Sequence, residues 1–452
     1  MGKDLLITCL LTVCLIFVQL RISAQTTSPY NAPSPDQTKP APQPPDLSYG
    51  GDLATRSTLT GDWGGRRDAL AKRGYIFNIG MTDIAQGNAS GGVNVPNIYR
   101  NQASQDLEIF INTEKARWWR KGLFRILIEA REGKSVNGTQ GSLFLVNMDS
   151  LYPRPFPLDV DTWALSAFSY TYLFSRQYNL TAGLIQTRPA NEFASNEKTQ
   201  FFSNKFNAAP PYGAIVPTVS FWGVVLGYNP ARQVKLLFAV VARGEIGTPA
   251  HFGGLIHGPK SYFANITVDV APGGHPGHQR LTVGYANRRR NILTPTTGLL
   301  LDDLLAPETT LNLTTAKFRN YDWLIAWDMD QYLYNIARNP HRGLGFFSKA
   351  VYTDGVVNPI KFFFNVGVGG KGVSQQRPYD SFGIGFYANQ LSSELPVQIK
   401  PALTNEYGFE AYYNYAIYPW LHITPDGQWI TRPTRRNAGS PFVPGVRVQI
   451  TF

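Results

Sequence analysis

The C-terminal stretch Val446-Arg447-Val448-Gln449-Ile450-Thr451-Phe452 alternates strictly between apolar and polar residues. Successive side chains of a β-strand point to opposite faces, so this stretch predicts a strand with one apolar and one polar face. A similar pattern recurs at residues 124–131, with Phe124, Ile126, Ile128 and Ala130 on one side and the charged Arg125, Glu129 and Arg131 on the other. A strand with lipid on one side and water on the other has this pattern.

Runs of this kind continue from residue 75 to the C-terminus. They predict about sixteen strands, near residues 75–85, 105–115, 121–132, 162–174, 177–187, 218–229, 232–243, 260–271, 279–288, 321–333, 343–354, 359–370, 379–389, 406–417, 420–431 and 442–452. An even number of antiparallel strands is typical of bacterial outer-membrane barrels. The predicted fold is therefore all-β, a transmembrane antiparallel β-barrel with a short N-terminal helix.

The predicted connections alternate between short and long, which supports the barrel independently of any single strand. Short links occur at 175–176, 229–232 and 418–419, and long ones at 86–104, 133–161, 188–217 and 289–320. Short turns on one rim and long loops on the other are typical of a barrel inserted from the periplasm. A soluble sandwich or propeller shares the period of two, but it does not explain the bulky residues along one face of the strand at 406–417.

Composition narrows the functional classes. Of the 452 residues, 43% are hydrophobic and only 16% are charged, which is too apolar for a disordered chain. The net charge is +11, yet the basic residues are spread along the chain, and Arg288-Arg289-Arg290 is the one dense run. We therefore expect no nucleic-acid partner, and we assign the excess charge to the lumen or to loops that meet anionic lipopolysaccharide.

The N-terminus has the features of an exported protein. Residues 1–24 combine Lys3, an apolar run and a small-residue end at Ala24, which predicts a signal peptide. Residues 25–57 are rich in Pro, Ser, Thr and Gln and predict a disordered periplasmic tether. Both cysteines, Cys9 and Cys14, lie in the signal, so the mature chain would contain none. Residues 58–452 form the predicted barrel domain.

One helix is predicted at residues 63–73, ahead of the first strand. Asp62 is the expected N-cap and Gly74 the expected residue that ends the helix. The helix could plug or line one mouth of the barrel, or simply cap its end.

The segment from Leu59 to Gly74, with Gly61-Asp62-Trp63-Gly64-Gly65 at its centre, resembles the opening motif of the carbohydrate-selective porins of the OprB family. Residues 418–429 are similar to that family's penultimate hairpin, and residues 444–452 to its last strand. The resemblance implies a barrel of sixteen strands, loops folded inward to narrow the channel, and passive diffusion of sugars across the outer membrane. It also favours a monomer, although many porins form trimers.

Two features depart from the resemblance. Family members often carry a charged pair after the Ala-Gly of the fifth strand, whereas Ala182-Gly183 is followed here by Leu184-Ile185-Gln186. The tether is also longer than the resemblance implies. The first difference puts a sugar-selective constriction of the usual kind in doubt.

A lumen that passes sugars needs charged and amide side chains that exchange hydrogen bonds with hydroxyl groups, and binding must stay weak. Strand alternation predicts a set of polar residues on the lumen face. Opposite charges on the second and third strands would then set a field across the channel. The predicted pore-lining residues are Asp106, Glu108, Asn112, Arg125, Glu129, Arg131, Asn265, Asp269, Arg280, Asp322, Asp328, Lys361, Asn365, Glu410, Asn414 and Arg447.

The sequence offers little for catalysis, and we predict no cofactor. His275 and His278 form a two-histidine fragment without a third ligand, and no nucleophile elbow or phosphate-binding loop occurs. The favoured interpretation is a porin in the bacterial outer membrane, in contact with lipid and lipopolysaccharide, with small sugars as permeants. A general or anion-preferring porin is the alternative, and a barrel enzyme or an envelope anchor is the alternative of another class.

Overall fold

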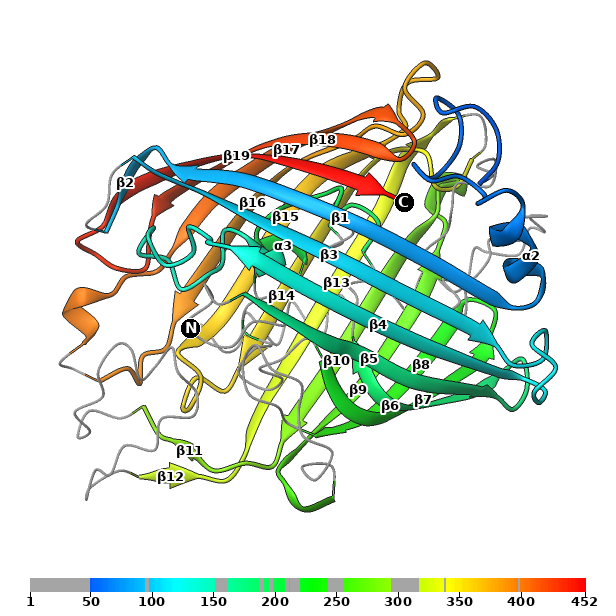
Figure 1. Ribbon diagram of the computed structural model, residues 1–452. Coiled ribbons are helices and arrows are strands. Elements are labelled where there is room, and N and C mark those ends of the chain that lie inside the picture. The colour runs from blue at the N-terminus through cyan, green and yellow to red at the C-terminus, as the bar shows by residue number, and fades with distance from the viewer. Residues whose placement is uncertain are drawn as a thin grey trace. The chain divides into compact units, whose positions relative to one another are not determined.

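The computed structural model shows a closed barrel of antiparallel strands, seen from the side in Figure 1. The structure describes residues 49–93, 97–150, 161–186, 191–194, 198–207, 211, 220–242, 256–293, 317–336, 339–396 and 399–452. The predicted signal peptide and all but the end of the predicted tether lie outside these residues. No helix among the described residues has both the length and the apolar character needed to span a bilayer.

Sixteen strands form the wall. They are β1 (Tyr75–Asn88), β3 (Ile98–Asn112), β4 (Gly122–Gly133), β5 (Thr162–Leu173), β6 (Tyr178–Gln186), β7 (Ser220–Ala231), β8 (Val234–Ala242), β9 (Lys260–Val270), β10 (Gly277–Ala286), β13 (Asp322–Asn335), β14 (Gly343–Thr353), β15 (Ile360–Lys371), β16 (Ser381–Leu391), β17 (Tyr407–Tyr418), β18 (Leu421–Arg432) and β19 (Gly439–Thr451). Each strand pairs with its neighbour in the sequence, and β1 pairs with β19 to close the sheet. The predicted fold class and strand number are confirmed.

Shorter elements complete the described chain. The short strand β2 (Ser90–Gly92) pairs with β19 beyond one end of β1, and β11 (Arg290–Asn291) pairs with β12 (Phe318–Arg319) outside the barrel. The α-helices are α2 (Arg66–Lys72) and α3 (Asn204–Asn207), and the 3-10 turns are η2 (Met148–Ser150), η4 (Pro272–Gly274) and η6 (Lys400–Ala402).

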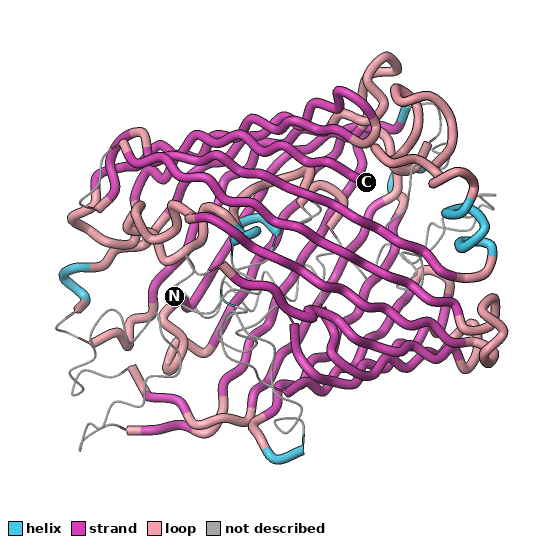
Figure 2. The backbone as a smooth tube through the Cα atoms, viewed as in Figure 1, coloured by secondary structure: helices cyan, strands magenta, loops and turns pink. Residues whose placement is uncertain are grey.

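The two rims differ as predicted. Figure 2 shows compact turns at the end that carries α2, while longer connections, including the one with η6, leave the opposite end. We call these the short-turn rim and the long-loop rim. The loop predicted at 86–104 is wrong, because β1 continues to Asn88 and β3 begins at Ile98, with Gln86 opposite Arg100. Polar residues occupy both faces here, so the alternation that marks a strand is missing.

The two faces of the wall have opposite character. Apolar side chains project outward along β17, and Phe409 and Tyr415 are 47% and 45% exposed. Aromatic rings gather near the rims, such as Tyr178 and Tyr228, which stack with their centroids 4.5 Å apart. Such girdles are typical of barrels at membrane interfaces. Tyr412 on β17 instead faces inward against Phe201.

Helix α2 fastens the seam where the barrel closes. Arg67 is buried, and its guanidinium donates to the backbone carbonyl of Phe452 at 2.8 Å and to that of Phe77 at 2.6 Å. Gly74 ends the helix in a left-handed conformation, as predicted. Asp62 is not the N-cap, because a left-handed Gly65 precedes the helix and the Asp62 carboxylate accepts a hydrogen bond from Gly64.

The residues just before α2 also contact the short-turn rim. The indole of Trp420 donates to the carbonyl of Leu53 at 2.7 Å, and the amide of Leu59 donates to Thr451 at 2.7 Å. The segment therefore lies across the turn between β17 and β18, beside the seam.

Candidate functional site

A loop between β6 and β7 enters the barrel. We call its described residues 191–194 and 198–207 the inward loop; α3 belongs to it and appears in the middle of the barrel in Figure 1. Its first part binds β13, where the Asn191 amide donates to the carbonyl of Met329 at 3.1 Å. Lys198 binds the opposite wall, where it donates to Ser104 of β3 at 2.9 Å. The inward loop thus crosses the interior.

Beyond Lys198 the inward loop follows the inner face of β15–β19. Its backbone accepts hydrogen bonds from three wall side chains: Ser381 to Thr199, Arg447 to Gln200 and Asn365 to Lys205, at 2.7–3.1 Å. Glu410 accepts from the amides of Phe202 and Ser203 at 2.6 and 3.2 Å. Charged partners make such bonds stronger than neutral ones.

Aromatic side chains of the inward loop pack where the wall has no side chain. Phe193, Phe201 and Phe206 are each no more than 1% exposed, and a Cβ atom at Gly369, Gly383 or Gly385 would run into their rings. Burying a phenylalanine stabilises by roughly 1.5–3 kcal/mol. The inward glycines of β15 and β16 therefore create the space that these phenylalanines fill.

The first charged group lies on β3 and β4, and we call it the β3–β4 cluster. It contains the pairs Arg125–Glu108 at 2.8 Å, Arg131–Asp106 at 3.0 Å and Arg131–Glu129 at 2.9 Å. Asp149 and Lys198 join it, since Asp149 lies 3.4 Å from both Arg131 and Lys198, and Lys198 also contacts Asp106. The Gln186 amide links the two halves by donating to Glu129 at 2.7 Å and accepting from Arg125 at 3.3 Å.

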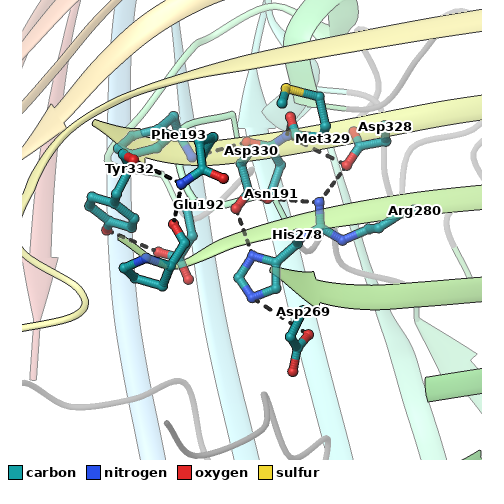
Figure 3. A network of polar contacts seen from close by, with 12 residues as sticks. Asn191, Glu192, Phe193, Asp269, His278, Arg280, Asp328, Met329, Asp330 and Tyr332 are labelled. Atoms are coloured by element: carbon teal, nitrogen blue, oxygen red, sulfur yellow. Dashed lines mark hydrogen bonds and ion pairs between the residues drawn. The ribbon is translucent and has the colours of Figure 1, made fainter. Parts of the chain in front are cut away.

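The second charged group lies on β9, β10 and β13, and we call it the β10–β13 cluster (Figure 3). Arg280 bridges Asp328 at 2.6 Å and Asp330 at 2.7 Å. His278 contacts Asp330 at 2.6 Å and faces Asp269 at 3.9 Å. Lys235 binds Asp269 at 2.8 Å and Lys349 binds Asp328 at 3.3 Å.

The two clusters lie on opposite sides of the barrel. Seven strands lie between β3 and β13 in either direction around the sheet. Acidic and basic groups are closely paired within each cluster, so much of the charge is compensated locally. The opposite signs expected on the second and third strands are present, but direct pairing weakens the transverse field that we predicted from them.

The charged residues of the inward loop and its surroundings are held by these contacts. Burial opposes the ionisation of Asp149, but the charges of Arg131 and Lys198 prevail and lower the pKa of its carboxyl group. Burial likewise opposes the ionisation of Glu192, while Lys371 at 3.3 Å and His341 lower its pKa. Both carboxylates therefore stay charged at neutral pH.

The side chain of Lys205 in the inward loop is not held by such contacts among the described residues. Burial lowers the pKa of its ammonium, and nearby Glu406, Glu410 and Asp426 oppose this shift. Within the described part of the chain its Nζ has no hydrogen-bond partner and lies 4.7 Å above the ring of Tyr387.

The predicted pore-lining residues fall into three groups. Eight belong to the clusters: Asp106, Glu108, Arg125, Glu129, Arg131, Asp269, Arg280 and Asp328. Three bind the inward loop: Asn365, Glu410 and Arg447. The remaining five serve other contacts or stand apart: Asn112, Asn265, Asp322, Lys361 and Asn414.

The members of that last group are varied. Asn112 accepts from Lys115 in a turn of the short-turn rim, and Asn265 donates to Thr282 at 2.7 Å. Asp322 is buried at the opposite end of the wall. Lys361 follows a register shift in β15, so strand alternation does not assign it a face.

Sequence reasoning missed the residues that the loops supply. Asp149, Asn191, Glu192, Lys198 and Lys205 all contact the wall, yet they stand in stretches without periodicity. The one available signal was the aromatic content of residues 201–206, because phenylalanines in an otherwise polar loop indicate a buried segment.

The histidines singled out from the sequence have other partners. His275 contacts Asn335 at 2.8 Å, and His278 contacts Asp330. Across the described ranges, no group of three or more His, Cys, Asp or Glu residues is arranged to hold a metal ion.

Comparison with known proteins agrees with this architecture. The family model described as carbohydrate-selective porin, OprB family, matches residues 98–452. Porin B of Pseudomonas aeruginosa is 21% identical over 435 residues, which cover 87% of this chain and 91% of Porin B. The putative porin QuiX of Acinetobacter baylyi is 35% identical over 81 residues, or 18% of each chain.

A solved structure shares the fold. The high-pH structure of Pseudomonas putida OprB aligns with a TM-score of 0.74 at 20% identity, covering 89% of this chain and all of the other. The low-pH structure of the same protein aligns with a TM-score of 0.55.

Proposed function

Because this chain belongs to the OprB family of carbohydrate-selective porins, we propose that sugars cross its barrel through a passage that the inward loop narrows between the two charged clusters. The chain is an outer-membrane channel of Gram-negative bacteria. We propose that it has no enzymatic activity. The observation that carries the proposal is the course of the inward loop, which binds β13 through Asn191 and β3 through Lys198.

Local charge compensation favours a neutral permeant. A sugar offers hydroxyl groups that both donate and accept hydrogen bonds, and closely paired acids and bases present both kinds of group. A strong uncompensated charge would instead enrich one sign of ion. The side chain of Arg125 is 17% exposed, and those of Lys235 and Asp269 are 17% and 30% exposed, so we assign these three residues direct contact with the permeant.

The sixteen predicted residues then divide by role. We propose that the cluster residues and Asn265 line the path, and that Asn365, Glu410 and Arg447 act through the inward loop that they hold. Gln186 takes the place where the family resemblance led us to expect a charged pair. Its amide can exchange hydrogen bonds with a sugar while it links Arg125 to Glu129.

A planar-bilayer experiment tests the function. We expect single channels whose conductance falls when glucose or maltose is added, because a bound sugar obstructs ions. Strong anion preference without sugar block would instead favour the general, anion-preferring porin. Absence of conductance in purified, folded protein would leave a barrel enzyme or an envelope anchor.

Two substitutions test whether the β3–β4 cluster lines the proposed sugar path. Arg125→Ala removes a positive charge from the β3–β4 cluster, where Arg125 pairs with Glu108 at 2.8 Å, so we expect cation selectivity to rise several-fold in reversal-potential measurements at low salt. Glu129→Ala should shift selectivity in the opposite direction. Unchanged selectivity in both variants would remove the β3–β4 cluster from the path.

We also propose that one barrel acts alone, because a single chain supplies the inward loop and both clusters. Sedimentation of the detergent-solubilised protein at the mass of one chain is the expected result. A stable trimer would contradict it without affecting the proposed path.

A further inference from the structure

An apolar groove lies on the outer wall, away from the proposed sugar path. It spans β7–β10, has a volume of about 480 Å³, and is lined by residues that include Val224, Phe238, Tyr262, Ala264 and Val283. Ala264 forms its floor, because the sheet register places Ala264 between Phe238 on β8 and Val283 on β10. These two neighbours are 47% and 46% exposed, so a small residue sits among projecting large ones.

Aromatic side chains stand where the groove approaches the long-loop rim. The ring of Tyr262 lies 6.2 Å from that of Tyr285, whose ring stacks on Tyr321 at 6.3 Å. Tyrosines at this level are typical of the boundary between lipid tails and headgroups.

Basic side chains lie just beyond these rings. They come partly from the basic run noted in the sequence, which the sugar path does not use. Exposed Arg289 lies over the ring of Phe318, 3.6 Å from the ring centre, and Lys317 next to it is also exposed. Lys260 is on the same face of β9 as Tyr262 and donates to the carbonyl of Gly258. Arg319 contributes less charge, because Asp354 pairs with it at 3.0 Å.

We propose that this strip binds one phosphorylated glycolipid of the lipid A type. An acyl chain would fill the groove over Ala264, and a phosphate would lie against Arg289, Lys317 and Lys260. Apolar surface below and positive charge above match the polarity of an anionic lipid in the outer leaflet. The inference rests on the proposed function, an outer-membrane channel, because such barrels hold their long loops at the cell surface.

The groove and the charge are testable separately. Ala264→Phe fills the groove, and the double variant Arg289→Glu, Lys317→Glu reverses the charge above it. Ala411→Phe is a matched control, because Ala411 faces outward on β17 between Phe409 and Tyr413. Lys115→Glu controls for charge reversal, since Lys115 is exposed on the short-turn rim.

Native mass spectrometry of the detergent-solubilised protein with bis-phosphorylated lipid A gives the readout. We expect one retained lipid in the unchanged protein, and retention at least about tenfold lower in both test variants but not in the controls. Lipid A without phosphates should bind weakly to all forms.

Equal loss of lipid in test and control variants would overturn the proposal, as would undiminished binding after Ala264→Phe. A change of oligomeric state in Ala264→Phe alone would identify a second copy of the chain as the occupant instead. Sugar-blocked conductance should persist in every variant, so failure of the lipid site remains distinguishable from failure of the channel.

Discussion

The inner faces of β14–β17 and of β7–β9 belong to the same barrel, yet they are built differently. On β15 and β16, inward glycines such as Gly369 and Gly385 accept phenylalanines of the inward loop. On β7–β9, inward positions near the long-loop rim carry apolar side chains, including Val225 and Val241, and those near the short-turn rim carry the Lys235–Asp269 pair. We call these regions the docked wall and the β7–β9 wall.

This difference separates two uses of a polar residue in a lumen. Glu410 of the docked wall and Arg447 of the nearby strand β19 bind the backbone of the inward loop, so they shape the passage indirectly. Asp269 pairs with another wall residue and retains 30% exposure, so it can meet a solute. Facing the lumen is therefore not sufficient to contact what passes through it.

The largest effect is expected when a glycine of the docked wall is replaced by a larger residue. Gly385→Val places methyl groups where the ring of Phe206 lies, and overpacking of this kind costs about 1–3 kcal/mol. We expect the inward loop to leave the wall, with a larger single-channel conductance, weaker sugar block and a lower unfolding temperature.

Gly427→Val is the control for this change. Gly427 faces outward on β18, and a Cβ atom there meets nothing closer than 3.5 Å. Unchanged conductance in Gly385→Val would show that the position of Phe206 does not control the passage.

A smaller change weakens the docking without adding bulk. Glu410→Gln removes the charge that accepts hydrogen bonds from Phe202 and Ser203, and bonds to charged groups contribute about 1.5–3 kcal/mol each. We expect noisier channel currents and faster cleavage by trypsin at Lys205, which is buried while the inward loop is docked.

Asp269→Asn provides the matched comparison, because the carboxylate of Asp269 binds Lys235 of β8 and faces His278 of β10, which both belong to the wall. Its cleavage rate should equal that of the unchanged protein. Equal rates in Glu410→Gln would contradict the anchoring role of Glu410.

The smallest effect is expected on the β7–β9 wall. Asp269→Asn breaks a partly exposed ion pair, and such pairs contribute only about 0–1 kcal/mol, so the unfolding temperature should hardly change. The freed Lys235 should shift selectivity modestly toward anions in reversal-potential measurements. Lys235→Gln should shift it toward cations, and identical shifts would place this pair outside the ion path.

Much of the wall could be predicted because its information is local. Alternation at residues such as 446–452 depends on the side-chain period of two, and it located all sixteen strands. It failed at 86–104, where Gln102 and Ser104 face inward while polar residues such as Asn101 occupy the other face. The helix-capping pattern misjudged Asp62, because the left-handed Gly65 sets the start of the helix.

The sequence by itself determined a barrel with an apolar exterior, because each strand has one face toward lipid and the other toward water. It also placed most polar residues on the inner face. Only the tertiary structure decided which of these residues hold the inward loop and which remain beside the passage. The physical reason is distance along the chain: Phe206 meets Gly385 and Lys198 meets Ser104 only after the sheet has closed, and no local pattern encodes such contacts.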